Sequence, residues 1–136
     1  MQKGLTLIEV LIVMVVVAIL AAIAVPSYTQ YILRGHRAEA RAQLMSIAQW
    51  QERFRTENNR FAAAANVPAS LTSLPSSNAT RYVITVNTAA DGSTYTLTAT
   101  RAGSQSSDAC GDLTLTNTGA RGIANSTRTV AECWGR

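Results

Sequence analysis

The sequence has few of the side chains from which catalytic and metal sites are usually built. It contains one histidine and two cysteines in 136 residues, and only 15% of its residues are charged. No Ser-His-Asp or Cys-His arrangement can be argued from the one histidine, His36, which we interpret as a solvated or interfacial residue. No glycine-rich loop that could cradle a phosphate is present. We therefore expect no enzymatic activity, no cofactor and no metal.

Lysine is also almost absent, since Lys3 is the only one and the other eleven cations are arginines. The formal net charge of +4 suggests nucleic-acid binding, but its distribution argues against a dedicated DNA-binding domain. From Ala62 to Arg136 there are five arginines against four acids, and DNA-binding domains are usually far more basic. The excess positive charge lies instead around Arg34, Arg37 and Arg41.

The two cysteines, Cys110 and Cys133, both lie close to the C-terminus. An even count in a chain with an export-like N-terminus favours a disulfide formed in an oxidising compartment. Closing that loop would stabilise the fold by about 3 kcal/mol in the chain-entropy model. The alternative is that both cysteines are free, buried thiols. If they form a disulfide, they cannot ligate a metal.

The most unusual feature is an uninterrupted run of sixteen apolar residues from Val10 to Val25. A soluble cytosolic enzyme of this size would not normally carry such a run. It could be a secretory signal peptide, with Ala22-Ile23-Ala24 as a small-x-small cleavage site, or a plain membrane anchor. Neither interpretation explains Glu9, because an ionisable group in a membrane span is costly and usually marks function.

A third interpretation gives Glu9 a role. The stretch Gly4-Leu5-Thr6-Leu7-Ile8-Glu9, followed by the apolar run, Pro26 and Ser27-Tyr28, closely resembles the N-terminus of type IV pilins. The resemblance implies that a prepilin peptidase cleaves between Gly4 and Leu5 and N-methylates Leu5. Glu9 would then be the fifth residue of the mature chain.

A carboxylate in an apolar environment must be protonated, paired or hydrogen-bonded. Cleavage after Gly4 would create an α-amino group that Glu9 could neutralise, either within its own helix or on an adjacent subunit. We expect the pairing between subunits to set the axial register of an assembling filament. Pro26 removes a backbone donor, so we expect a kink or local melting of the helix there.

Apolar residues resume beyond Pro26 at helical spacing and predict one helix of about fifty residues that ends at Asn58-Asn59. A loop is predicted to about Thr80. Alternating segments then predict antiparallel strands, with Asp91-Gly92 as a hairpin signal. The expected fold class is α+β, a long helix packed on a small antiparallel sheet with a C-terminal disulfide loop. The predicted helical stripe consists of Ala40, Leu44, Ile47, Ala48 and Phe54, and the predicted strands are Tyr82–Val86, Tyr95–Ala99, Leu113–Thr116 and a short stretch near Ile123.

The second half of the chain resembles the PilE and ComP-like minor pilins, through the Tyr95–Thr100 and Cys110–Leu115 segments, Gly119 and the closing Cys133-Trp134. Together with the N-terminal resemblance, it implies a leader at 1–4, a helix at 5–57 and a β-sheet head at 58–136. Within the helix, 5–25 would form the transmembrane segment and filament core, and 26–57 would be amphipathic.

The expected function is that of a structural subunit, a minor pilin, supporting adhesion, twitching motility or DNA uptake. It would wait in the inner membrane with its head in the periplasm and then join a cell-surface pilus. Its partners would be other pilin subunits, the inner-membrane assembly machinery and the prepilin peptidase. The alternatives are a major pilin and a pilus-displayed DNA receptor. The DNA contacts of such a receptor would be phosphates bound by Arg81, Arg101, Arg121 and Arg128, with tyrosine or Trp134 stacking on bases.

Overall fold

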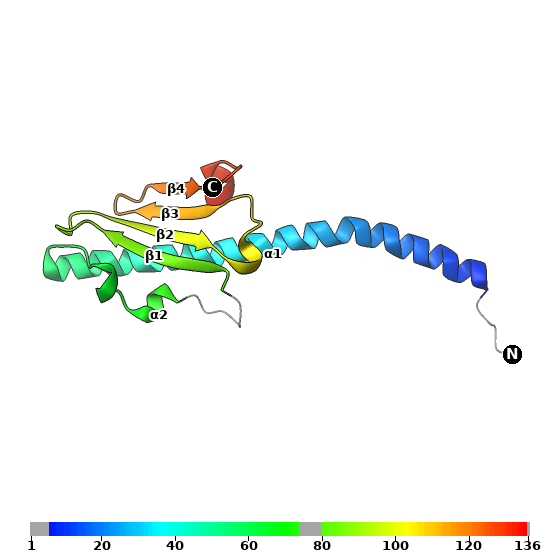
Figure 1. Ribbon diagram of the computed structural model, residues 1–136, viewed down its shortest axis with the longest axis horizontal. Coiled ribbons are helices and arrows are strands. Elements are labelled where there is room, and N and C mark those ends of the chain that lie inside the picture. Colours follow the sequence, from blue (N-terminus) through cyan, green and yellow to red (C-terminus); the bar gives the residue numbers. More distant parts are fainter. Residues whose placement is uncertain (1–5, 74–79, 136) are drawn as a thin grey trace. The chain divides into compact units, whose positions relative to one another are not determined.

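The computed structural model describes residues 6–73 and 80–135. The chain divides into two compact units, Met1–Arg34 and Gly35–Arg136. One helix, α1 (Leu7–Asn58), contributes to both (Figure 1). The first part of α1, residues 7–34, makes up the first unit together with Thr6, as far as the structure describes it. The second part, residues 35–58, belongs with the β-sheet in the second unit, which we call the head.

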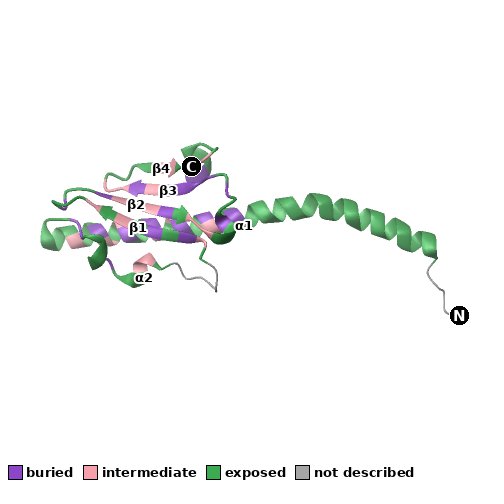
Figure 2. Ribbon diagram, viewed as in Figure 1, coloured by how far each residue is buried: buried purple, intermediate pink, exposed green. Residues whose placement is uncertain are grey.

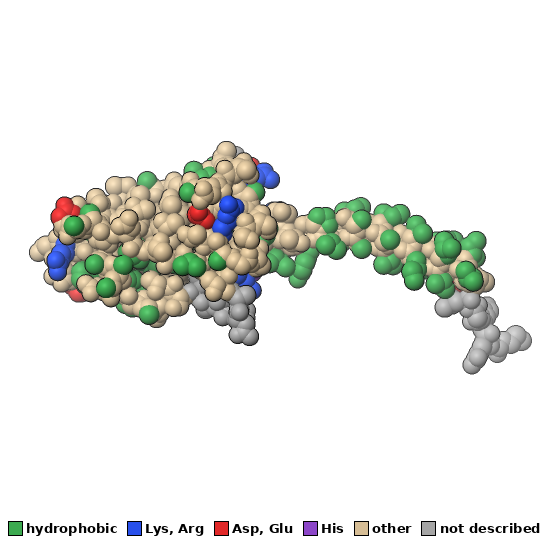
Figure 3. Space-filling view, in the orientation of Figure 1, with side chains coloured by type: hydrophobic (Ala, Val, Ile, Leu, Met, Phe, Trp, Pro, Cys, Tyr) green, Lys and Arg blue, Asp and Glu red, His purple; other side chains and the backbone are tan. Residues whose placement is uncertain are grey.

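The first part of α1 is apolar up to Val25 and exposed up to Ile32. Every residue from Thr6 to Ile32 is exposed (Figure 2), and hydrophobic side chains run along this segment (Figure 3). By length and composition, α1 contains one stretch able to cross a membrane. A helix that is apolar all round needs a bilayer or other helices to cover it.

The head contains a four-stranded antiparallel sheet in the order β1-β2-β3-β4. The strands are β1 (Tyr82–Thr88), β2 (Tyr95–Arg101), β3 (Asp112–Thr116) and β4 (Arg121–Ala124). Ile84 pairs with Ala99 and Leu97 with Leu115, so the apolar residues of successive strands share one face. This arrangement confirms the predicted α+β class.

The core lies between that apolar face and the second part of α1 (Figure 2). Leu44, Ile47, Leu97 and Leu113 are fully buried. Of the predicted helical stripe, Ala40, Leu44 and Ile47 are buried in the core and Ala48 packs against it. Phe54 is half-buried and does not belong to this cluster, whereas Gln51 is fully buried. The Gln51 side chain explains this placement: its amide donates to the carbonyl of Ala62 at 3.0 Å and its carbonyl accepts from the Ala62 N–H at 2.8 Å.

The ends of the elements follow from local chemistry. Asn59 adopts a left-handed φ of 55°, and its N–H donates to the carbonyl of Arg55 at 2.8 Å, which ends α1. In the β1–β2 turn, the carboxylate of Asp91 accepts from the Ser93 N–H at 3.0 Å. Gly92 follows with a φ of +70°, and a Cβ there would lie 2.8 Å from that of Arg60. Glycine is therefore required at this turn.

Four short helices in the described residues were not predicted. A 3₁₀ turn (Ala64–Asn66) and α2 (Ala69–Thr72) lie within the predicted loop, and the 3₁₀ turn Gly103–Gln105 follows β2. A further helix, α3 (Val130–Trp134), follows β4 and begins with a capping box formed by Thr129 and Glu132. The indole N–H of Trp134 donates to the carbonyl of Gly122 at 2.9 Å, which satisfies a carbonyl of edge strand β4.

Candidate functional site

Glu9 lies in the first turn of α1, at the end of an exposed apolar segment. Its N–H donates to the hydroxyl of Thr6 at 3.3 Å. Thr6 and Glu9 have the spacing of a capping box, in which the helix-capping threonine is followed three residues later by glutamate or glutamine. This hydrogen bond makes Thr6 the capping side chain at the start of α1, since the donor is the backbone N–H of residue 9. The spacing would also let the Glu9 side chain complete a capping box, so a test of its assembly role must separate the two. The sequence analysis did not identify the capping role of Thr6, although the Thr6–Glu9 spacing indicates it.

Gly4 and Leu5 lie outside the described residues, so the cleavage and methylation positions stay predictions. Pro26 lies inside α1, which is helical on both sides of it. Because proline lacks an N–H, the carbonyl of Ala22 loses its ordinary helical partner. One turn on, the hydroxyl of Thr29 donates to the carbonyl of Val25 at 3.1 Å. The predicted kink stays a prediction.

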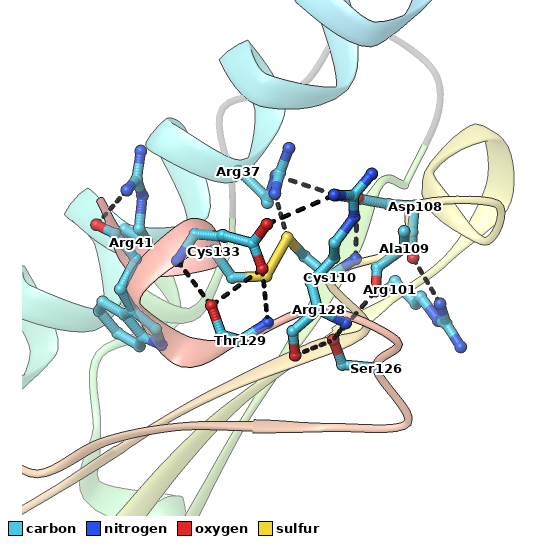
Figure 4. The surroundings of a disulfide bond; sticks show 12 residues. Arg37, Arg41, Arg101, Asp108, Ala109, Cys110, Ser126, Arg128, Thr129 and Cys133 are labelled. Atoms are coloured by element: carbon cyan, nitrogen blue, oxygen red, sulfur yellow. Dashed lines mark hydrogen bonds and ion pairs between the residues drawn. A yellow bond between two sulfur atoms is a disulfide. The ribbon is translucent and has the colours of Figure 1, made fainter. Parts of the chain in front are cut away.

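The Cys110–Cys133 disulfide is present, with Cα atoms 5.5 Å apart, and both residues are buried. It ties the segment before β3 to α3. Figure 4 shows that charged side chains surround this bond. The guanidinium of Arg37, on α1, donates to the sulfur of Cys110 and lies 3.1 Å from the carboxylate of Asp108. The disulfide loop is therefore attached to α1 by charge as well as by packing.

Asp108 is almost fully buried, and four groups surround its carboxylate. Besides Arg37, the Gln105 amide donates to it at 2.7 Å and the Cys110 N–H at 3.1 Å. The hydroxyl of Tyr82 lies 3.5 Å away. Burial first, and then the negative charge of Asp108, raises the pKa of Tyr82.

His36, predicted to be solvated or interfacial, is half-buried, and its Nδ1 lies 3.2 Å from the Gln105 side-chain oxygen.

The four arginines predicted to contact DNA do not form one exposed patch. Arg101 donates to the carbonyls of Asp108 and Asn125 at 2.6 and 3.1 Å and lies 4.0 Å from the carboxylate of Asp112. Arg128 pairs with Glu132 at 3.4 Å (Figure 4). Arg81 immediately precedes β1 and is half-buried. These contacts give Arg101 and Arg128 structural roles.

Arg121 is exposed, and its guanidinium lies over the ring of Trp134, 5.6 Å from the centroid. Trp134 is only 5% exposed. The prediction that Trp134 stacks on bases was therefore wrong, because the ring is buried beneath Arg121 and within the head.

The sequence did not single out Arg37 and Asp108 as partners. Arg37 lies three residues before Ala40, on the helical face that continues with Leu44 and Ile47. This spacing could have indicated that Arg37 is buried.

A long helix with an exposed apolar segment, an antiparallel sheet on its second part and a C-terminal disulfide define a pilin fold. A type IV pilin structure from Shewanella oneidensis is similar, with a TM-score of 0.54 and 29% sequence identity over 71% of this chain and 98% of that one. The family model "Type IV minor pilin ComP, DNA uptake sequence receptor" matches residues 26–114. A second model, "Prokaryotic N-terminal methylation motif", matches residues 1–25.

Curated relatives are similar over shorter segments. The type IV major pilin protein PilA of Myxococcus xanthus is 38% identical over 65 residues, which cover 48% of this chain and 30% of that protein. Fimbrial protein EcpC of Eikenella corrodens is 54% identical over 39 residues, 29% of this chain and 26% of that protein. The matches thus span under a third of these relatives. The chain belongs to the type IV pilins, in the family of the minor pilin ComP.

Proposed function

We propose that this pilin is a minor subunit of a type IV pilus, assembled through its N-terminal helix. The observation that carries the proposal is the exposed apolar segment from Leu7 to Val25, in which Glu9 is the one ionisable residue. Before assembly a bilayer would cover this surface, with the chain spanning the inner membrane once and its head in the periplasm. In the pilus, the helices of other subunits would cover it. The family and fold are those of structural proteins rather than enzymes.

The chemistry of assembly would depend on processing. Hydrolysis of the Gly4–Leu5 peptide bond by a prepilin peptidase would free the α-amino group of Leu5. In a second step, the same enzyme would transfer a methyl group from a methyl-donor cosubstrate to that amine. Glu9 on one subunit would pair with the Leu5 amine of its neighbour. Because an unpaired charge is costly in an apolar bundle, only the register that brings the two groups together would be stable. The inner-membrane assembly machinery would supply each subunit to the growing filament.

Two substitutions at Glu9 separate this role from helix capping. Glu9→Ala removes both the charge and the side chain that could complete a capping box with Thr6, whereas Glu9→Gln removes the charge but keeps a side chain that can complete one. We expect both variants to insert into the membrane and to be absent from sheared filaments. Normal incorporation of the Gln variant would refute the charge-pairing proposal, since capping alone would then explain Glu9.

The minor role is supported by the match to a minor-pilin family over most of the head. A major pilin is the alternative, because curated major pilins are among the relatives. Quantitative mass spectrometry of sheared filaments distinguishes the two. We expect this chain to be a small fraction of the filament protein, and a dominant share would make it the major pilin. The pilus would serve adhesion, twitching motility or DNA uptake.

A second candidate function is binding of DNA by the head. It is favoured by the family description, which names a DNA uptake sequence receptor, and by arginines that no acid neutralises, described below. We expect the full chain in non-ionic detergent to bind duplex DNA with an affinity that falls as salt rises, because phosphate contacts release counterions. Absence of salt-dependent binding at low ionic strength would remove this candidate and leave the structural role intact.

A further inference from the structure

Two arginines that are distant in sequence meet at Trp134. Arg41, on α1, donates a hydrogen bond to the carbonyl of Trp134, while Arg121, at the start of β4, lies over the indole ring. Gly135 makes room for Arg41: it has a φ of +73°, and a Cβ there would lie 3.0 Å from the Arg41 guanidinium. The last turn of the head thus gathers two guanidinium groups around one residue.

No acid in the described part of the chain forms an ion pair with either arginine. The ion pairs found there join Arg37 to Asp108, Arg101 to Asp112 and Arg128 to Glu132. Arg41 and Arg121 are close enough to repel each other: burial, then the positive charges of Arg37 and Arg121, lower the pKa of Arg41. Two like charges held together without a counter-ion favour the binding of an anion between or beside them.

The geometry of Arg121 suits such a ligand. The guanidinium of Arg121 lies over the Trp134 ring, 5.6 Å from its centroid. No group in the described residues accepts a hydrogen bond from it. A guanidinium held over a ring by a cation–π contact keeps its N–H donors, and two of them in a fork match two phosphate oxygens. The contact with the ring also restricts the side chain, so less conformational entropy is lost when a ligand binds.

The outer face of the sheet is a poor alternative for a polyanion. Its central positions are threonines, with Thr85 opposite Thr98 and Thr98 opposite Thr114. These side chains carry no charge to attract phosphate. A DNA backbone would therefore be drawn to the edge of the head formed by β4 and α3 rather than to this face.

We propose that Arg41 and Arg121 form a phosphate-binding subsite for the backbone of duplex DNA, with Trp134 as the residue that positions Arg121. The inference rests on the proposed DNA binding and names where it occurs. Only the phosphate is contacted at this subsite, so it would contribute affinity without sequence preference. The sequence analysis named four arginines of the head as possible phosphate contacts. The proposal keeps Arg121 from that set and adds Arg41.

The test measures binding of a fluorescent duplex of mixed sequence by anisotropy, at several salt concentrations, to the full chain in non-ionic detergent. The principal variant is Arg121→Gln, because Arg121 is exposed and its loss leaves the core intact. Arg53→Gln is the matched control, since Arg53 is also exposed and lies in the same helix as Arg41. Arg41→Gln is a second variant. Urea unfolding of each variant establishes that the head remains folded.

We expect Arg121→Gln to lower the slope of log affinity against log salt by about 1 and to weaken binding about tenfold at roughly 0.1 M salt. The double variant with Arg41→Gln should weaken binding further, and Arg53→Gln should have little effect. If Arg121→Gln and Arg53→Gln behave alike while the wild type binds, the subsite is wrong and DNA binding stands. If the wild type does not bind DNA, both proposals are refuted.

Discussion

Replacing Asp108 by Asn tests the interpretation of the disulfide region most sharply. Asn has nearly the same shape as Asp but no charge. In the wild type, the Asp108 side chain is 3% exposed and its carboxylate lies 3.1 Å from the Arg37 guanidinium, which is 10% exposed. The substitution therefore leaves a buried cation without its counter-ion. The Gln105 amide also loses a charged acceptor at 2.7 Å.

Removing one partner of a buried ion pair costs about 3 to 5 kcal/mol, most of it the penalty for the charge left behind. We therefore expect Asp108→Asn to lower the free energy of unfolding of the head by about 3 to 5 kcal/mol. The double variant Arg37→Gln/Asp108→Asn should recover part of this loss, because it leaves no charge unpaired. The matched control is Arg128→Gln, which breaks a pair that is 57% and 50% exposed and should cost under about 1 kcal/mol.

Urea unfolding at neutral pH, followed by tryptophan fluorescence with the disulfide intact, measures these differences. The ranking of the variants matters as much as the size of the change. If Asp108→Asn falls within about 1 kcal/mol of the wild type, Arg37 and Asp108 do not act as a buried pair. If the double variant is less stable than Asp108→Asn alone, the reasoning about the unpaired charge is wrong.

Three further predictions concern the stability of the head. Leu97→Ala should cost about 2 to 5 kcal/mol because Leu97 is fully buried, while exposed Val83→Ala should be nearly neutral; similar urea midpoints for the two would contradict the core assignment. Replacing both cysteines by Ser should lower the free energy of unfolding by about 3 kcal/mol, since the disulfide joins residues 23 positions apart. An unchanged free energy of unfolding would contradict the prediction that the disulfide stabilises the head. Burial and the charge of Glu52 raise the pKa of Tyr95 to about 12, and Tyr82 shifts in the same direction. Unfolded tyrosines ionise near pH 10, so stability should hold up to about pH 10 and then fall with rising pH, by up to about 1.4 kcal/mol per pH unit for each tyrosine; stability that stays flat up to about pH 11 would refute this.

The fold was predictable because its main signals are local. The apolar run, the helical spacing from Ala40 to Ile47 and the alternation of Tyr82–Val86 each depend on residues a few positions apart. The disulfide was also predictable, since two cysteines allow one pairing. Short helices such as α3 carry too few residues for a periodic pattern, although the Thr129–Glu132 capping box marks the start of α3.

The polar contacts were not predictable, because they join segments that only the fold brings together. Arg37 meets Cys110 across 73 positions, and Arg41 meets Trp134 across 93. Whether an arginine is neutralised depends on such neighbours, so composition could not separate Arg101, which lies among Asp108, Asn125 and Asp112, from Arg121. Burial of Trp134 likewise depends on α3, an element that the sequence did not predict.

The mature N-terminus tests the central claim most directly, because pairing through Glu9 requires a free amine four residues before it. Mass spectrometry of the chain purified from cell membranes identifies that terminus. We predict a chain that begins at Leu5 and carries an N-methyl group. A chain that begins at Met1 would have no free amine at Leu5, and one that begins at Val25, the last residue of the apolar run, would lack Glu9 and the apolar segment. Either result would rule out assembly through Glu9.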